Sequence, residues 1–78
     1  MARLVFLGRL EDIAGVPEIE VSEGPLAEIV AGLGRELALA LTGDRIRIAH
    51  NGVLVSESGG VVLKPGDEVA FLPPVSGG

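Results

Sequence analysis

The last two residues of the sequence, Gly77 and Gly78, have the type and place that suit a covalent reaction. We expect Gly78 to carry a free α-carboxylate, which has a pKa near ~3.5 and is ionised at neutral pH. An ionised carboxylate is a poor electrophile, so it must first be activated, for instance as an acyl-adenylate. A sulfur nucleophile would then convert the activated group to a thiocarboxylate. This end is therefore a candidate for activation and group transfer.

The lack of side chains at both positions indicates that this end enters a narrow site. Glycine has no Cβ, takes conformations closed to other residues, and lets a partner approach its backbone closely. Side chains at the last two positions would block a close-fitting channel in another enzyme. A terminal Gly-Gly alone is a weak signal, since Gly59-Gly60 in the same chain is interpreted as a loop.

A short segment connects this reactive end to a strand. Its two prolines lack backbone N–H groups and fix φ, so they end the strand and favour a stiff, extended stalk. We therefore divide the chain into a folded domain, residues 1–72, and an extended, flexible tail, residues 73–78. A passive, frayed terminus is the alternative. The tail residues that we expect a partner to contact before the glycines are Pro73, Pro74, Val75 and Ser76.

Size and composition bound the class of protein. Seventy-eight residues make one domain, and a chain this short buries only ~60% of its unfolded surface. It contains no cysteine, so no disulfide or thiolate metal site is available, and its net charge is −5. That charge disfavours nucleic acid, whose phosphates need Lys and Arg, and favours a basic protein partner. With no apolar run near the ~20 residues of a membrane helix and no signal peptide, we expect a cytoplasmic protein that binds no membrane.

Alternating apolar residues predict strands at residues 3–8, 18–22, 45–50, 53–55 and 68–72. The pair Asn51-Gly52 predicts a tight hairpin. The run Lys64-Pro65-Gly66-Asp67 predicts a type II turn. We interpret residues 9–16 as a connection, with Ile13 as its anchor and a turn at Gly15.

One main helix is predicted in the middle of the chain. Its apolar stripe follows the i, i+3, i+4, i+7 spacing and consists of Leu26, Ile29, Val30 and Leu33. Pro25 suits the first helical position, with Ser22 or Gly24 as the cap. Two glycines weaken the helix after the stripe, and Leu37 and Leu41 indicate a further turn or two.

Four outward apolar side chains of the first and last strands form a candidate docking surface. If these two strands are neighbours, the four residues make one patch at the root of the tail. A contiguous patch of this kind usually marks an interface. Coverage by a loop or by the second helical segment is the alternative. The four residues are Val5, Leu7, Ala70 and Leu72.

The remaining polar residues suggest no catalytic or metal site. For His50, the one histidine, neither a nucleophile nor an orienting acid can be assigned, so we interpret it as a structural residue at a strand end. The eleven carboxylates show no calcium-loop spacing and no acid pair. No glycine-rich phosphate cradle is present, so the chain is not expected to bind ATP itself.

The run from Gly66 to Gly78 closely resembles the C-terminus of the small subunits of molybdopterin synthase, a family of ubiquitin-like sulfur carriers. Residues 6–15 look like the first strand of that family and the segment after it, although the family usually has a basic residue at the place of Glu11. Residues 49–52 resemble a middle segment. The resemblance implies an α+β, ubiquitin-like β-grasp fold. Its mixed sheet of about five strands wraps around one main helix, with the first and last strands parallel in the middle.

The same resemblance implies a non-catalytic sulfur-donor subunit that binds no cofactor itself. An adenylyltransferase of the ubiquitin-activating type would consume ATP to adenylate Gly78, and a sulfur donor enzyme would convert the adenylate to a thiocarboxylate. The two kinds of subunit would form a heterotetramer, in which the tail enters the large subunit of molybdopterin synthase. The catalytic residues for dithiolene formation would lie in that large subunit. Gly77 would give clearance, and Pro73 and Pro74 would direct the tail.

Three other functions stay open. A related carrier could serve thiamine thiazole, cysteine or tRNA thiolation, although the approach from Phe71 to Ser76 favours the molybdopterin branch. A ubiquitin-like protein modifier would be joined through Gly78 to lysines of other proteins. A plain interaction module would have a passive tail.

Overall fold

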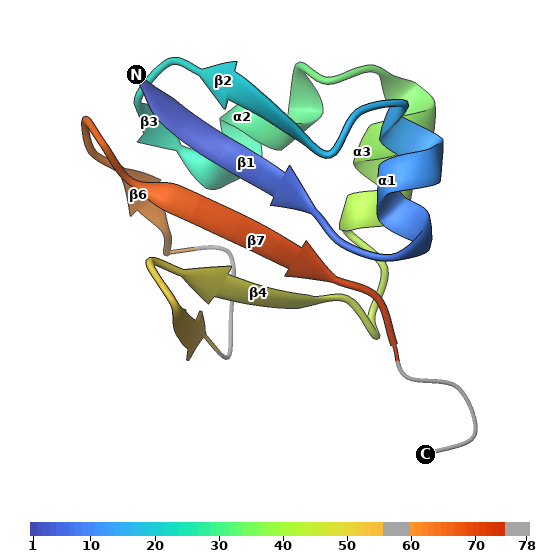
Figure 1. The fold of residues 1–78 in the computed structure, drawn as a ribbon. Coiled ribbons are helices and arrows are strands. Elements are labelled where there is room, and N and C mark those ends of the chain that lie inside the picture. The colour runs from blue at the N-terminus through green and yellow to red at the C-terminus, as the bar shows by residue number, and fades with distance from the viewer. Residues whose placement is uncertain (56–59, 75–78) are drawn as a thin grey trace.

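The computed structural model describes residues 1–55 and 60–74 of the chain (Figure 1). The elements within these ranges are β1 (Ala2–Phe6), α1 (Arg9–Ala14), β2 (Glu18–Val21), β3 (Gly24–Pro25), α2 (Leu26–Ala31), α3 (Arg35–Leu41), β4 (Arg47–His50), β5 (Val53–Val55), β6 (Val62–Leu63) and β7 (Glu68–Leu72).

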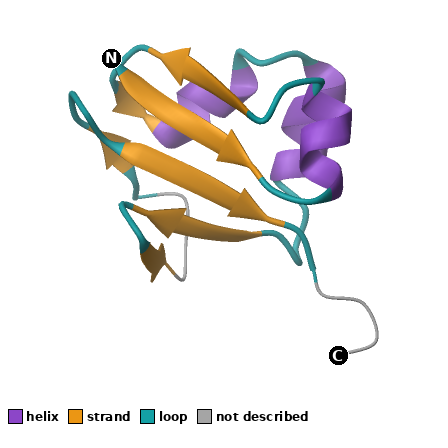
Figure 2. Cartoon of the chain, in the orientation of Figure 1, coloured by secondary structure: helices purple, strands orange, loops and turns teal. Residues whose placement is uncertain are grey.

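Five of the strands form a mixed sheet in the order β2-β1-β7-β4-β5, with β7 in its centre. β1 pairs with β7 in parallel, so that Leu4 lies opposite Val69 and Phe6 opposite Phe71. β4 runs antiparallel on the other side of β7, and the helices α2 and α3 lie behind the sheet in the orientation of Figure 2. The expected β-grasp arrangement, with the first and last strands parallel in the middle, is therefore confirmed.

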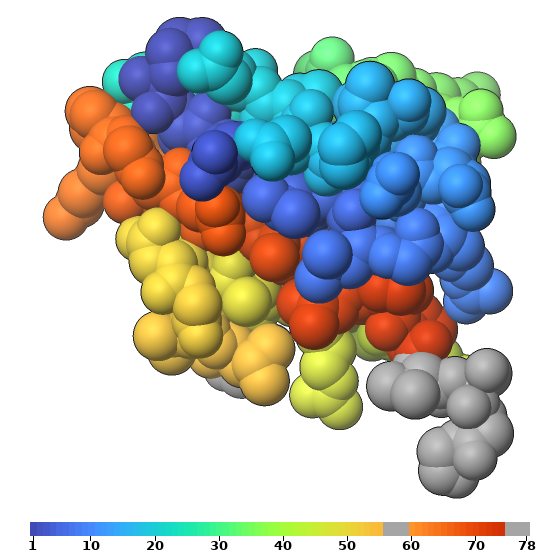
Figure 3. All heavy atoms as spheres, in the orientation of Figure 1, coloured from blue at the N-terminus to red at the C-terminus, as the bar shows by residue number. Residues whose placement is uncertain are grey.

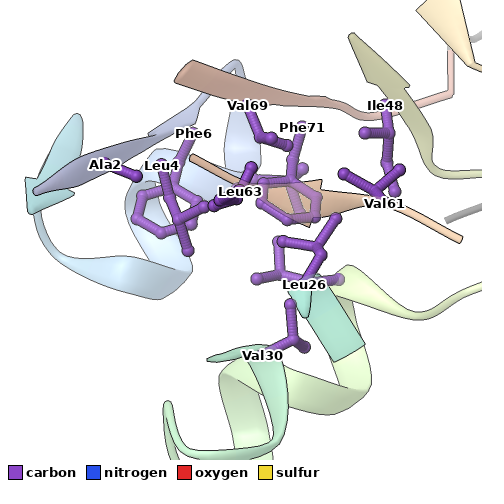
Figure 4. Packing of buried hydrophobic residues seen from close by; sticks show 12 residues of the cluster. Ala2, Leu4, Phe6, Leu26, Val30, Ile48, Val61, Leu63, Val69 and Phe71 are labelled. Carbon is purple, nitrogen blue, oxygen red and sulfur yellow. The ribbon is translucent and has the colours of Figure 1, made fainter. Parts of the chain in front are cut away.

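The core lies between the inner face of the sheet and α2. Phe6 and Phe71 stack with their ring centroids 6.0 Å apart and their planes 20° apart. In Figure 4, Leu26 of α2 points toward Phe71. The buried residues are Ala2, Leu4, Phe6, Leu10, Leu26, Val30, Leu41, Ile48, Val61, Leu63, Val69 and Phe71. The strands alternate as predicted, since every second residue of β1 and β7 is in this set.

The predicted main helix is divided in two. The apolar stripe of α2 faces the core as expected, with Leu26 and Val30 buried and Ile29 and Leu33 packed beside them. The helix then stops at Ala31, because the following glycines interrupt it, and Gly34 with φ of 98° precedes α3. All helices in residues 1–55 are six or seven residues long. None in the described part of the chain is long and apolar enough to cross a membrane.

The expected connection at residues 9–16 was wrong in part, because it contains α1. The expected anchor, Ile13, has 41% of its surface exposed, whereas Leu10 is buried with only 2% exposed. Leu10 and Ala14 are four residues apart on one helical face, and Ala14 also packs against the core. A helix of six residues is too short to give a clear apolar period. Gly15 turns the chain as predicted, with φ of 83°.

The start of α2 was also predicted incorrectly. Gly24 and Pro25 form β3, which pairs with β6 in a separate two-stranded sheet. Pro25 is the residue before the helix rather than its first residue, and no side chain caps this end. Instead the N–H of Leu26 donates to the carbonyl of Val61 at 2.9 Å. The residue that precedes the distant strand β6 therefore caps this helix, and local sequence cannot reveal such a contact.

Both predicted turns are present. Asn51 and Gly52 have φ of 51° and 84°, as a tight hairpin between β4 and β5 requires. In the turn before β7, Gly66 has φ of 86°. The N–H of Asp67 there donates to the carbonyl of Lys64 at 3.0 Å. The hairpin turn sets the register between β4 and β5, whereas the second turn leads from β6 in the small sheet to β7 in the large one.

Candidate functional site

The central strand β7 ends at Leu72 and leads directly into the tail, residues 73–78 (Figure 1). Of the tail, Pro73 and Pro74 are described, and both are half-buried. The remaining candidate residues of the tail lie outside the described part of the chain; they are Val75, Ser76, Gly77 and Gly78. The structure therefore places the root of the tail at the end of the sheet's most central strand.

A close contact with Gly8 positions the root of the tail. Gly8 follows β1 with φ of 57°, in the left-handed region, and a Cβ built on it would lie 3.0 Å from Cγ of Pro73. A side chain at this position would therefore both strain the backbone and press against the proline. Because β1 and β7 are parallel neighbours, the absence of a side chain at Gly8 leaves room for the first residue of the tail beside the segment that follows β1.

The outward apolar residues predicted from the sequence lie on one face of the sheet. Val5 is directly opposite Ala70, and the N–H of Leu7 donates to the carbonyl of Phe71 at 3.2 Å, which keeps Leu7 beside the end of β7. Leu72, two residues after Ala70, is on the same side of its strand. Val5, Ala70 and Leu72 are half-buried, and Leu7 is 40% exposed.

This surface continues onto two strands that the sequence reasoning did not include. Ala49 of β4 lies opposite Ala70, and Leu54 of β5 lies opposite Ala49 with 61% of its surface exposed. We call the six residues together the outer patch; they are Val5, Leu7, Ala49, Leu54, Ala70 and Leu72. The alternation of β4 already put Ala49 outward, but only the order of the strands shows that it adjoins Ala70. Figure 3 views the molecule from this side of the sheet.

Charged residues border the outer patch at the end of the sheet away from the tail. The guanidinium of Arg3 lies 2.7 Å from Glu68 and 3.3 Å from Glu18. All three side chains are about half exposed, so we expect these ion pairs to add little stability. Arg47, opposite Leu72 on β4, is exposed near the root of the tail. Apart from Arg47, the outer face is therefore apolar near the tail, and it is ion-paired at its other end.

His50 belongs to a different cluster at that other end. Its Nε2 lies 2.9 Å from Oδ2 of Asp67, while Asn51 Nδ2 donates to Asp67 Oδ1 at 3.0 Å. The N–H of Lys64 also donates to Asp67, at 3.0 Å. His50 pairs with Val69 near the start of β7, so it is remote from the tail. The cluster joins the β4–β5 hairpin to the turn before β7, which fits a structural histidine.

Hydrogen bonds lower the pKa of the Asp67 carboxyl from 3.8 to about 2. The largest contribution comes from the N–H of Lys64, followed by the side chains of Asn51 and His50. The folded state therefore favours the ionised form, and this stabilisation is present above pH 3.8 and is lost as pH falls toward 2. We expect Asp67→Asn to be less stable than wild type at neutral pH and to lose less stability on acidification. Chemical denaturation at about pH 5 and about pH 2.5 would measure both effects.

The matched control for this prediction is Glu36→Gln, which removes an exposed carboxylate on α3. It should keep the acid sensitivity of the wild type, because Asp67 is unchanged. If Asp67→Asn and wild type lost the same stability on acidification, the cluster would not couple protonation to folding.

In residues 1–55 and 60–74, no group of three His, Asp or Glu side chains is placed to hold a metal ion.

Comparison with known proteins gives consistent matches over nearly the whole chain. The ThiS family model matches residues 4–78. The molybdopterin synthase sulfur carrier subunits of Haemophilus influenzae and Escherichia coli are 32% and 34% identical, each over 100% of this chain and 100% of the relative. The solution structure of the small archaeal modifier protein 1 from Methanosarcina acetivorans is 28% identical, with a TM-score of 0.75, over 99% of this chain and 95% of that one.

Proposed function

The chain belongs to the ThiS family, and we propose that it is the sulfur carrier subunit of a cytoplasmic molybdopterin synthase. The observation that carries this proposal is the match to two such subunits at 32% and 34% identity over their whole length. The fold supports it, because the most central strand of the sheet leads through Pro73 and Pro74 to Gly77 and Gly78.

The reaction on the carrier takes place at the α-carboxylate of Gly78. An oxygen of this carboxylate attacks the α-phosphorus of ATP in the activating enzyme, which releases pyrophosphate and leaves an acyl-adenylate. Sulfur at the oxidation level of sulfide, supplied by a donor enzyme, then attacks the acyl carbon; the bond to AMP breaks, AMP leaves, and the thiocarboxylate remains. Activation is needed because the carboxylate is ionised at neutral pH. In the large subunit, the sulfur of the thiocarboxylate bonds to the pyranopterin precursor of the dithiolene, and water then cleaves the bond between this sulfur and the acyl carbon and restores the carboxylate of Gly78.

The folded domain contributes position rather than chemistry to this reaction. The outer patch docks the carrier on the large subunit and on the activating enzyme, and the contact of Pro73 with Gly8 sets the direction in which the tail leaves. The outer patch fits this role because it is contiguous, apolar and next to the tail. Docking of a rigid patch beside the tail reduces the freedom that the tail must lose to reach an active site.

A protein-modifier function is the second candidate, because the chain is 28% identical to a small archaeal modifier protein with the same fold. A modifier needs the same activation of Gly78, but its acyl group ends on a lysine of another protein. Conjugates of this chain in cell lysate, detected as isopeptide-linked peptides that contain Gly78, would support this function. A carrier for thiamine thiazole, cysteine or tRNA thiolation would form the thiocarboxylate but would not yield molybdopterin.

The experiment that tests the main proposal has two stages. The chain is incubated with ATP, an activating enzyme and a sulfur donor, and its intact mass should rise by the difference between one sulfur and one oxygen atom. The thiocarboxylated chain is then mixed with a large subunit and the precursor, and molybdopterin should form. A chain that lacks Gly78 is the control and should remain folded and inactive in both stages. If the chain were thiocarboxylated but no molybdopterin formed, the chain would be a sulfur carrier for another pathway.

The docking role of the outer patch predicts the effect of Leu72→Asp and of Leu7→Asp. Each should leave the fold largely intact, because neither side chain belongs to the buried core. Each should weaken binding to both the large subunit and the activating enzyme by about ten-fold or more, since a desolvated carboxylate opposes an apolar contact. Isothermal titration with each partner would measure the change. Leu39→Asp, at a 65% exposed position of α3, is the control, and affinities equal to this control would exclude a shared docking surface.

A further inference from the structure

An open groove lies along the edge of the sheet that the proposed function does not use. It lies between α2 and the segment from Val21, the last residue of β2, to Pro25, and has a volume of about 340 Å³. Val21 of β2, Ile29 of α2 and Leu33 contribute apolar surface to it, and the carboxylate-bearing residues Glu23 and Glu28 also line it. β2 is the terminal strand of the five-stranded sheet. The groove therefore adjoins an unpaired strand edge.

The backbone of β2 has hydrogen-bonding groups directed away from the sheet. The N–H of Phe6 donates to the carbonyl of Pro17 at 2.8 Å, so this antiparallel pair is a hydrogen-bonded one. Such pairs alternate with non-hydrogen-bonded ones along an antiparallel ladder. The register places Glu18 and Glu20 in the non-hydrogen-bonded positions. Their N–H and C=O groups consequently point outward from the edge and are available to another strand.

The apolar residues beneath this edge are incompletely covered. Ile19 and Val21 of β2 alternate with the two glutamates and pack against the core, and Val21 lines the groove together with Ile29 and Leu33. All four side chains are half-buried, although they pack against the core. A strand added at the usual spacing of about 4.8 Å would place alternate side chains over this seam.

The acidic residues around the groove favour a positively charged partner segment. Glu18 is paired with Arg3 and Glu23 with the amino group of Met1. Within residues 1–55 and 60–74, neither Glu20 nor Glu28 forms an ion pair. A second copy that paired through its own β2 would bring like charges together, which disfavours self-association at this edge. A segment that carries Lys or Arg beside its apolar residues is complementary to it.

We propose that an extended apolar segment of a partner protein, flanked by Lys or Arg, adds to the edge of β2 and fills the groove between the end of β2 and α2. Its backbone pairs with Glu18 and Glu20, and alternate apolar side chains contact Val21, Ile29 and Leu33. Main-chain hydrogen bonds then supply affinity, whereas the pockets and charges supply specificity. Basic residues at its ends lie close to Glu20 and Glu28.

This surface is separate from the outer patch and from the tail. β1 lies between β2 and β7 in the sheet, and the groove is on the side of the sheet that faces α2. A segment bound there leaves Ala70, Leu72 and Pro73 uncovered. The chain would therefore be held by one partner through β2 while its tail reacts in another. The proposal does not depend on which reaction the tail undergoes.

The test is a titration of the isotope-labelled full chain with the blocked peptide Lys-Lys-Val-Thr-Val-Thr-Lys-Lys, followed by NMR of the backbone amides. We expect saturable shifts at Glu18 and Glu20 and along α2, and slower hydrogen exchange of the Glu20 amide. A peptide with glutamates in place of the lysines should bind about ten-fold more weakly. A peptide with proline in place of the inner threonine should also bind more weakly, because it lacks a donor for the edge.

Charge-reversing variants locate the site. Glu28→Lys should weaken binding of the lysine-flanked peptide by about three-fold or more and improve binding of the glutamate-flanked one. Glu36→Lys, on α3, has the same charge change away from the groove and should alter neither affinity by more than about two-fold. The proposal is overturned if the amides of β2 do not shift, if both peptides bind equally, or if the shifts lie at the edge of β5 or on the outer patch instead.

Discussion

Phe71→Ala should cost about 3–5 kcal/mol of folding stability, the largest loss that we expect from one core truncation. The Phe71 side chain is 1% exposed, stacks on Phe6 and lies opposite Ile48 on the neighbouring strand. It also borders a cavity of about 100 Å³ that Leu26 and Leu41 help to line. Loss of the ring would enlarge this void, and the cost of a truncation rises with the volume left empty.

The loss approaches the whole stability of so small a domain, which is about 5 kcal/mol at the lower end of the usual range. Urea denaturation at 25 °C, analysed as a two-state transition, would measure it. Phe71→Leu keeps most of the apolar volume and should be clearly milder. Leu39→Ala removes a side chain that is 65% exposed and should change stability by less than about 0.5 kcal/mol. A similar small change for Phe71→Ala would show that this ring does not organise the core.

Much of this core could be predicted because period-two alternation directly reports burial. Leu4, Phe6, Val69 and Phe71 alternate with the four residues expected to face outward, and all four are buried. The hairpin at Asn51-Gly52 could be predicted because only a few residue types accept positive φ. The parallel pairing of the first and last strands has no local signal, and only the family resemblance suggested it.

The errors have a common physical origin in non-local contacts. α1 is a helix because Leu10 and Ala14 pack on the core, which a six-residue segment cannot indicate by itself. β3 and β6 have two residues each and exist because they pair with each other. Leu26 is capped by Val61, thirty-five positions away by their residue numbers. Local propensity is a weak guide where such distant partners decide the conformation.

The candidate site could be predicted to the extent that it follows strand alternation. Val5, Leu7, Ala70 and Leu72 were expected on one face, and the register puts Val5 beside Ala70. The extension to Ala49 and Leu54 required the order of the strands, which the sequence does not state. The contact between Gly8 and Pro73 was also missed, because the only local signal was a glycine after a strand.

Gly77→Val should slow adenylation, sulfur delivery or both by about 10²-fold, while the protein still folds and docks. The substitution keeps the carboxylate of Gly78 and adds one branched side chain immediately before it. Valine is restricted in χ1 and excludes the positive φ values that glycine allows. Docking through the outer patch should survive, since that surface is on the folded domain. Rates of adenylate formation and of molybdopterin formation, measured separately at saturating partner, would show which step is affected.

Gly77→Ala separates the two physical reasons for a glycine at this position. If the tail needs positive φ at residue 77, alanine should be nearly as harmful as valine, because both carry a Cβ. If the active site is merely narrow, alanine should reduce the rates much less, since it adds one methyl group rather than a branched side chain. The melting temperature and the affinity for each partner should match wild type for both variants. Wild-type rates for Gly77→Val in both half-reactions would exclude a close-fitting channel and would leave the glycine pair without a steric role in sulfur transfer.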